Sequence, residues 1–236
     1  MEHFATTRWS LVLDASSELT PRGRQALATL CELYWYPLYA YLRRRGHSAE
    51  DAQDLTQGFF AHMLDKHALH MVDRARGRFR SFLLASLNHY LSNMRDHDRA
   101  QKRGGGTPQI SLDGVTAEDR YLREPADRWT PEKVFDRNWA LTVLDRVFRR
   151  LRTDLQAEGK GELFQHLHVY LTGEEGRVVY SEVGATLGIS EGAVKVAVHR
   201  MRRRYRDLLH QEIAHTVVTA DEVELELQYL IAALST

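Results

Sequence analysis

The chain has 236 residues, with 32 Lys or Arg balanced by 32 Asp or Glu, so its formal net charge at pH 7 is zero. A hydrophobic share of 43% predicts a soluble globular chain of one or two domains. The zero net charge does not exclude a nucleic-acid binder, because the charge is unevenly distributed. Residues 190–206 hold six Lys or Arg and one acid, whereas residues 211–236 hold five acids and no Lys or Arg.

The single cysteine, Cys31, lies among leucines, so the sequence supports neither a disulfide nor a thiolate metal site. We predict a core thiol in a reducing compartment. The start of the chain has no basic region followed by an apolar run, and no stretch approaches a membrane span. A cytoplasmic location without membrane insertion is therefore expected.

The first helices are predicted over Thr6 to Leu13 and over Arg22 to Arg44. The second of these patterns is rich in aromatic residues, and Pro37 is expected to kink it or to start a new helix. Another helix is predicted from Ala49 to about Asp65, with acids in its first turn, where the helix dipole favours them. Its spacing predicts that Ala52, Leu55, Phe59 and Met63 are buried and that Glu50, Asp54, Gln57 and Ala61 point outward. Taken alone, such a polar stripe is typical of a solvated face.

Arginines then recur at every second position around a glycine, at Arg74, Arg76, Arg78 and Arg80. This pattern predicts a loop or helix edge that contacts phosphate. The next predicted helix, residues 81–103, is apolar at first and then basic. Cations near a helix C-terminus complement the dipole, but that effect accounts for only part of the basic run.

Residues 104–130 begin with three glycines and lack a sustained hydrophobic period, so we assign them to an interdomain linker. Thr130 and Pro131 predict the start of a long helix to about Gln156, and leucines at 163, 167 and 171 predict a short one. No stretch alternates for long enough to build a sheet. The expected fold is all-α, with two small helical domains joined by a flexible linker.

A helix-turn-helix is predicted over residues 183–206. Gly184 is expected to let the second helix come close, Gly188 to form the tight turn, and Ser190 to cap the second helix. Apolar residues form one side of that helix: Val194, Val198 and Met201. The opposite side has the composition of a DNA-reading surface: Glu191, Lys195, His199, Arg202 and Arg203.

An acidic helix with an apolar stripe is predicted at the end of the chain, starting at the capping box Thr219 to Glu222. Simple packing and a regulatory role explain this helix about equally well. As a hypothesis, we expect it to screen the basic helix-turn-helix domain.

Three segments, in this order, make the chain resemble bacterial RNA polymerase sigma factors of the sigma-70 family, in particular the extracytoplasmic-function group. Asp51 to Phe60 (DAQDLTQGFF) resembles the helix that binds core polymerase, Arg78 to Leu84 with Asn88 resembles the promoter-melting segment, and Tyr180 to Tyr205 resembles the minus-35 reader. Three residues depart from the group's usual pattern: Gly58 replaces a longer, often acidic residue, Phe82 a frequent Trp, and Ala197 a common Arg.

The resemblance implies two promoter-reading domains and no catalytic activity, cofactor or metal. It divides the chain into a region 2-like domain (1–103), a linker (104–130), a region 4-like domain (131–212) and an acidic extension (213–236). The implied contacts with core RNA polymerase are Asp51, Asp54, Leu55, Gln57 and Phe60. The implied contacts with minus-10 promoter DNA are Lys66, Arg74, Arg76, Arg78, Arg80, Asn88, Arg95 and Arg99. The implied minus-35 contacts are Ser190, Glu191, Lys195, Val196, His199, Arg200 and Arg203. An anti-sigma factor or other regulator is a further partner that the resemblance suggests.

Two other classes of function are alternatives to this reading of the sequence. The first is a stand-alone helix-turn-helix regulator that binds duplex DNA as a dimer through its C-terminal helix. The second is a metalloenzyme using the histidines His62, His67, His70, His166 and His168. Neither the pair at 62 and 67 nor the pair at 166 and 168 shares a helical face, so the spacing argues against a metal site.

Overall fold

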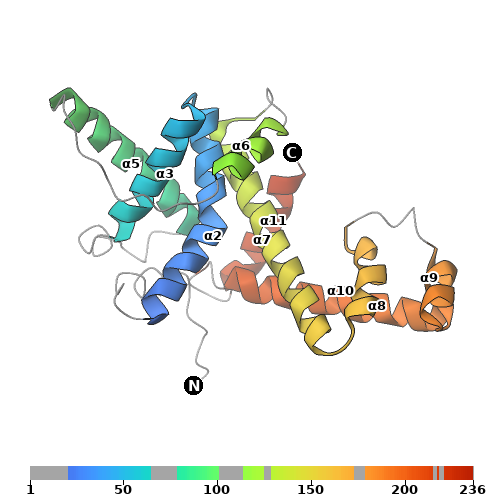
Figure 1. Cartoon of the computed structure of the whole chain (residues 1–236). Helices are drawn as coiled ribbons and strands as arrows, with labels where there is room; N and C mark the ends of the chain where they lie inside the picture. Colours follow the sequence, from blue (N-terminus) through green and yellow to red (C-terminus); the bar gives the residue numbers. More distant parts are fainter. Residues whose placement is uncertain are drawn as a thin grey trace, which may run out of the picture. The chain divides into compact units, whose positions relative to one another are not determined.

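The computed structural model describes residues 21–64, 79–100, 114–124, 129–172, 179–214, 217 and 221–235, and all regular structure in these ranges is helical (Figure 1). The helices are α2 (Pro21–Arg44), α3 (Ala49–Leu64), α5 (Phe79–Ala100), α6 (Gly114–Leu122), α7 (Pro131–Ala157), α8 (Gly161–Leu167), the short 3-10 helix η2 (His168–Tyr170), α9 (Tyr180–Leu187), α10 (Glu191–Ala214) and α11 (Asp221–Leu234). The predicted all-α class is confirmed. The prediction for Thr6 to Leu13 lies outside the described residues.

The chain divides into two compact units. Unit 1 comprises Met1–Thr142 together with Ile213–Thr236, and unit 2 comprises Val143–Glu212. The boundaries fall inside α7 and near the end of α10, so each of these helices contributes to both units. The four-part division made from the sequence stays a prediction.

Helix α2 is the central helix of unit 1. Every residue from Leu33 to Leu42 is buried, which is the pattern of a helix surrounded by others. The helix continues through Pro37, so no new helix begins there. Aromatic contacts join it to α5, where the rings of Tyr34 and Phe79 meet edge to face with centroids 5.3 Å apart.

Helix α3 contacts α2, α5 and α6, and this crowding corrects one prediction. The sequence spacing placed Gln57 on an outward stripe, but Gln57 is buried. Thr56 and Phe60 are buried beside it. With three neighbouring helices, the buried arc of α3 is wider than the single apolar stripe that the sequence spacing suggests.

Helix α6 lies within the range that was assigned to a linker. Its Glu118 forms an ion pair with Arg43 of α2, at 2.7 Å between Oε1 and Nη2, and also accepts a hydrogen bond from Tyr39. Just beyond the helix, the Tyr36 hydroxyl donates to Glu124 at 2.6 Å. The bond from Arg43 lowers the pKa of Glu118, so the carboxylate stays charged in this contact. Helix α6 was not predicted, because a helix of nine residues is too short to show a sustained hydrophobic period.

Unit 2 has its own apolar core, formed by the second half of α7, α8, α9 and α10. The buried residues include Val147, Leu151, Phe164, Leu167, Val183, Val194, Val198, Met201 and Leu208. Two arginines of α10 fix the neighbouring elements. Arg202 donates to the carbonyl of Tyr170 at 3.0 Å, and Arg204 pairs with Asp154 of α7 at 3.2 Å.

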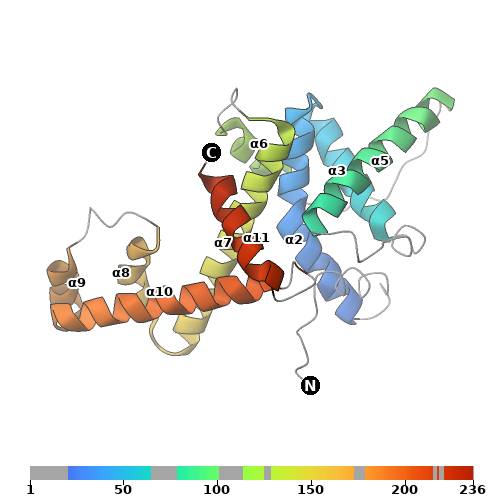
Figure 2. The same ribbon diagram turned by 180° about the vertical axis from the view of Figure 1, so that it is seen from behind.

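Helix α11 packs within unit 1 beside the first half of α7, as both ribbon views show (Figures 1 and 2). Its buried residues are Glu226, Leu227 and Leu230. The hydroxyl of Tyr229 donates to Asp136 of α7 at 2.5 Å. Leu227 and Leu230 of the apolar stripe predicted for this helix are therefore used in packing within unit 1, whereas Ile231 of the same stripe is 61% exposed.

Candidate nucleic-acid interface

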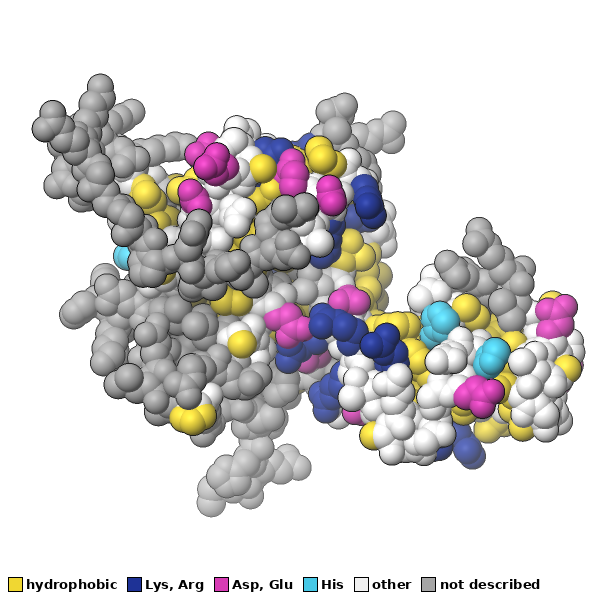
Figure 3. All heavy atoms as spheres, viewed as in Figure 1, with side chains coloured by type: hydrophobic (Ala, Val, Ile, Leu, Met, Phe, Trp, Pro, Cys, Tyr) yellow, Lys and Arg dark blue, Asp and Glu magenta, His cyan; other side chains and the backbone are white. Residues whose placement is uncertain are grey.

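The acidic residues predicted on α3 are exposed. Asp51 and Asp54 both lie on the surface, and Figure 3 shows acidic side chains over the upper part of α3 in that view. Asp51 is held by the start of the helix, because its backbone N–H donates to Ser48 Oγ at 3.0 Å and its carboxylate accepts from the same hydroxyl at 2.7 Å. Leu55 is half-buried, whereas Gln57 and Phe60 are buried. Of the five residues assigned to polymerase contact, the two aspartates thus have the most accessible side chains.

Gly58, which departs from the sigma-factor pattern, is explained by packing. A Cβ atom at this position would lie 2.5 Å from the hydroxyl oxygen of Tyr90 on α5. The Tyr90 ring packs against Phe59 and His62, which lie on α3 as Gly58 does, with ring centroids 5.9 Å and 5.3 Å away. A longer residue at position 58 would therefore require Tyr90 to move.

The turn of the helix-turn-helix has the geometry that the sequence predicted. Gly188 follows α9 with a φ of 66°, in the left-handed region that favours glycine. A Cβ on Gly184 would lie 2.7 Å from the carbonyl oxygen of Ile189, so only glycine permits this approach between α9 and the turn. Ser190 caps α10, because its Oγ accepts a hydrogen bond from the N–H of Ala193 at 3.2 Å.

Helix α10 presents opposite faces to the core and to solvent. Val194, Val198 and Met201 are buried, as predicted. The predicted minus-35 residues are all exposed: Ser190, Glu191, Lys195, Val196, His199, Arg200 and Arg203. The structure thus brings this whole set together on one accessible surface, which starts at the N-terminus of α10.

Charged contacts on α10 separate its arginines into two groups. Arg202 and Arg204 are engaged with Tyr170, Asp154 and Glu158 inside unit 2. Arg200, Arg203 and Arg206 are exposed, and Arg202 is exposed as well apart from its contact with Tyr170. Lys195 pairs with Glu191 at 2.7 Å, and this contact raises the pKa of the lysine. Because both partners are exposed, a phosphate can compete with Glu191 for the lysine at little cost.

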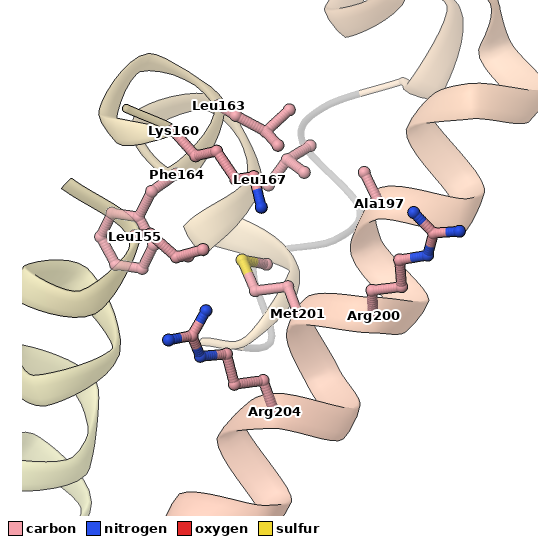
Figure 4. Close-up of a pocket in the computed structure, with 9 residues that line it drawn as sticks. All are labelled: Leu155, Lys160, Leu163, Phe164, Leu167, Ala197, Arg200, Met201 and Arg204. Atoms are coloured by element: carbon pink, nitrogen blue, oxygen red, sulfur yellow. The ribbon is translucent and has the colours of Figure 1, made fainter. Parts of the chain in front are cut away.

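A cavity of about 180 Å³ lies between α8 and α10 (Figure 4). Its apolar lining includes Phe164, Leu167 and Met201, and Lys160, Arg200 and Arg204 supply the cationic part of its wall. The cavity thus differs in chemistry from the mainly polar outer surface of α10.

The predicted minus-10 residues are only partly described. Lys66, Arg74, Arg76 and Arg78 lie outside the described residues, and Arg95 and Arg99 lie on α5 where the side chains are not described. Asn88 is exposed, and its Oδ1 accepts hydrogen bonds from Arg45 and from the Tyr41 hydroxyl, the latter at 3.2 Å.

Arg80, the remaining member of this set, is buried in a charged cluster. Its guanidinium pairs with Glu226 of α11, and Nε lies 3.4 Å from Asp136 Oδ1 on α7. Two aromatic rings enclose it, with the guanidinium carbon 3.7 Å from the centroid of Tyr229 and 4.7 Å from that of Trp139. This cluster has no signature in the sequence, because its members are distant in the chain and belong to no local pattern.

Of the five histidines considered as metal ligands, His67 and His70 lie outside the described residues, and two of the others have aromatic neighbours. His62 packs against the Tyr90 ring, and His168 stacks on Phe164 and contacts the carbonyl of Gln165 at 2.8 Å. In the described ranges, no group of three or more His, Cys, Asp or Glu side chains is arranged to hold a metal ion. None of the helices in these ranges has the length and hydropathy required to cross a bilayer.

Comparison with known proteins gives one relative. The protein named ECF RNA polymerase sigma factor SigE, from Mycolicibacterium smegmatis, is 28% identical to this chain over 185 residues. The chain is similar to an extracytoplasmic-function sigma factor. The aligned part covers 78% of this chain and 61% of the relative, so the chain spans less than two thirds of that protein's length. No family model matches the chain, and no solved structure matches it significantly.

Proposed function

We propose that this chain is an alternative sigma factor, which binds core RNA polymerase and directs it to promoters without catalytic activity of its own. The observation that carries the proposal is the exposed surface of α10, where a capped helix after a glycine turn presents Lys195, His199, Arg200 and Arg203 together. Such a helix fits the major groove, with its N-terminal residues near base edges and its cations near phosphates. The similarity to a named sigma factor supports this assignment.

In this proposal, α3 is the polymerase-binding element. Asp51 and Asp54 provide exposed carboxylates, while the buried Gln57 and Phe60 hold the helix against its neighbours. The minus-10 strand is assigned to the segment around Lys66 to Arg78 and to α5 beyond it. Two promoter-reading modules on one polymerase act at high effective concentration on spaced elements, which compensates for the modest discrimination of a single helix.

The alternative of a dimeric stand-alone regulator is less well supported. It requires the apolar stripe of α11 to be available for a second copy. Leu227 and Leu230 of that stripe are instead buried within the chain's own unit 1.

Co-purification with core RNA polymerase tests the proposal. We expect the wild-type chain to retain core polymerase, and Asp54→Arg to abolish retention, because it reverses an exposed charge on α3 without disturbing a buried contact. Asp207→Arg is the matched control, since it makes the same charge reversal at an exposed position of α10. Equal retention by the two variants, or none by the wild-type chain, would contradict the proposal.

A further inference from the structure

The side chain of Arg80 is enclosed by α11 and α7. It is 4% exposed, and the Glu226 side chain that pairs with it is 2% exposed. Its guanidinium is bonded to two carboxylates and covered by two rings, as described above. While α11 is docked, Arg80 is therefore inaccessible to any external anion.

The two residues of α11 that meet Arg80 resemble the two parts of a nucleotide. Glu226 supplies an anionic oxygen to the guanidinium, as a phosphate does in charge-assisted pairing. Tyr229, three residues later, stacks a ring 3.7 Å from the guanidinium carbon, as an unpaired base stacks on arginine in single-strand binding proteins. An acid and an aromatic ring on one helical face thus satisfy both recognition modes of Arg80.

The charge of α11 agrees with this likeness. The helix has four acids, Asp221, Glu222, Glu224 and Glu226, and no Lys or Arg, so it is a local polyanion. A buried ion pair contributes little net stability, because the cost of desolvating the two charges offsets much of their attraction. A helix of 14 residues also depends on its packing to stay folded. These properties suit a contact that has to be broken.

We propose that α11 is an intramolecular competitor of single-stranded nucleic acid, with Glu226 and Tyr229 occupying the Arg80 site in place of a phosphate and a base. Binding of a strand at Arg80 and docking of α11 exclude each other. This inference rests on the proposed function in one respect, namely that the segment before α5 binds single-stranded promoter DNA. The expectation that the acidic helix screens the helix-turn-helix domain is separate and stays a prediction, because Glu226, which pairs with Arg80, is only one of the acids of α11.

A set of full-length variants tests the competition, with fluorescence anisotropy of a labelled single-stranded oligodeoxynucleotide of mixed sequence as the readout. Glu226→Gln is expected to raise affinity about tenfold, because it removes the charged contact that occupies Arg80. Glu224→Gln, which removes one acid from the exposed face of the same helix, should change affinity less than about twofold. Arg80→Gln added to Glu226→Gln should cancel the gain. Equal affinities of the two glutamine variants, or a gain that persists without Arg80, would overturn the proposal.

Hydrogen exchange of the wild-type chain provides a test that does not depend on the variants folding. Coupling between strand binding and the docking of α11 is reciprocal. Saturating the chain with the same oligodeoxynucleotide should therefore speed amide exchange in residues 221–234. Unchanged exchange there would refute the competition. Neither experiment contains RNA polymerase. A negative result in either one is therefore distinguishable from a failure of the chain to bind core polymerase.

Discussion

Replacing Gly184 by alanine tests the packing of the helix-turn-helix, and Gly192 provides a matched control. Both glycines are in helices, in the interior of α9 and in the first turn of α10. At position 184 a new Cβ would lie 2.7 Å from the carbonyl oxygen of Ile189, which belongs to the backbone and cannot move independently. At position 192 the nearest atom is Ser190 Oγ, at an ordinary contact distance of 3.9 Å.

These distances give the two substitutions opposite signs. Alanine gains about 1 kcal/mol over glycine in helix propensity at either position. Overpacking at position 184 costs about 1–3 kcal/mol, and because the contact is with backbone we expect the upper part of that range. Gly184→Ala should therefore destabilise unit 2 by up to about 2 kcal/mol, whereas Gly192→Ala should stabilise it by about 0.5–1 kcal/mol.

Native-state hydrogen exchange of amides in α9 and α10 measures this difference, because it reports the opening free energy of unit 2 separately. All four tryptophans of the chain precede Val143, so tryptophan fluorescence follows unit 1 as an internal control and should be unchanged. An increase in protection in both variants would refute the assigned close approach at Gly184.

Three further predictions concern stability. Gly58→Ala should lower the melting temperature of unit 1, as measured by tryptophan fluorescence. The loss should be smaller in a Tyr90→Phe background, which lacks the clashing hydroxyl, and an equal loss in both backgrounds would exclude the Tyr90 contact as the cause. Leu151→Ala, at a position that is 0% exposed, should cost unit 2 about 2–5 kcal/mol in hydrogen exchange, and a cost below about 1 kcal/mol would show that the core is looser than described. Burial raises the pKa of Tyr205 to about 12, so the stability of unit 2 should be undiminished below about pH 10, the ordinary pKa of an exposed tyrosine, and should fall as pH rises towards 12. Tyr205→Phe should lessen that fall, and a variant with the same alkaline slope would contradict the assignment.

The local signals in the sequence predicted the helix-turn-helix well. Three features of it are encoded by residues that lie close together in the chain: the left-handed turn at Gly188, the cap at Ser190 and the buried face at Val194 and Val198. At such short range, spacing and residue type are enough to predict the local structure. The same helical period placed Glu191, Lys195, His199 and Arg203 on the exposed face, whereas Val196 and Arg200 were added by the resemblance to sigma factors. The outward position of Asp54 on α3 was predicted from the same helical period.

The remaining features depend on long-range contacts. The burial of Gln57 follows from three helices that surround α3, and the ion pair of Arg80 with Glu226 joins residues 146 positions apart. Nothing in the local pattern at Arg80 separates it from an arginine that contacts phosphate. Helix α6 is held by contacts of Glu118 and Glu124 with Arg43 and Tyr36 of α2, and no periodicity reveals these contacts.

Footprinting on a promoter fragment tests the central proposal most directly. The fragment is chosen because core RNA polymerase transcribes it in the presence of this chain. The account predicts protection of two spaced elements with the chain and core polymerase together, and little specific protection with either alone. Lys195→Ala combined with Arg203→Ala should remove protection of the upstream element while the chain still binds core polymerase. Protection of a single palindromic site by the chain alone would contradict the account.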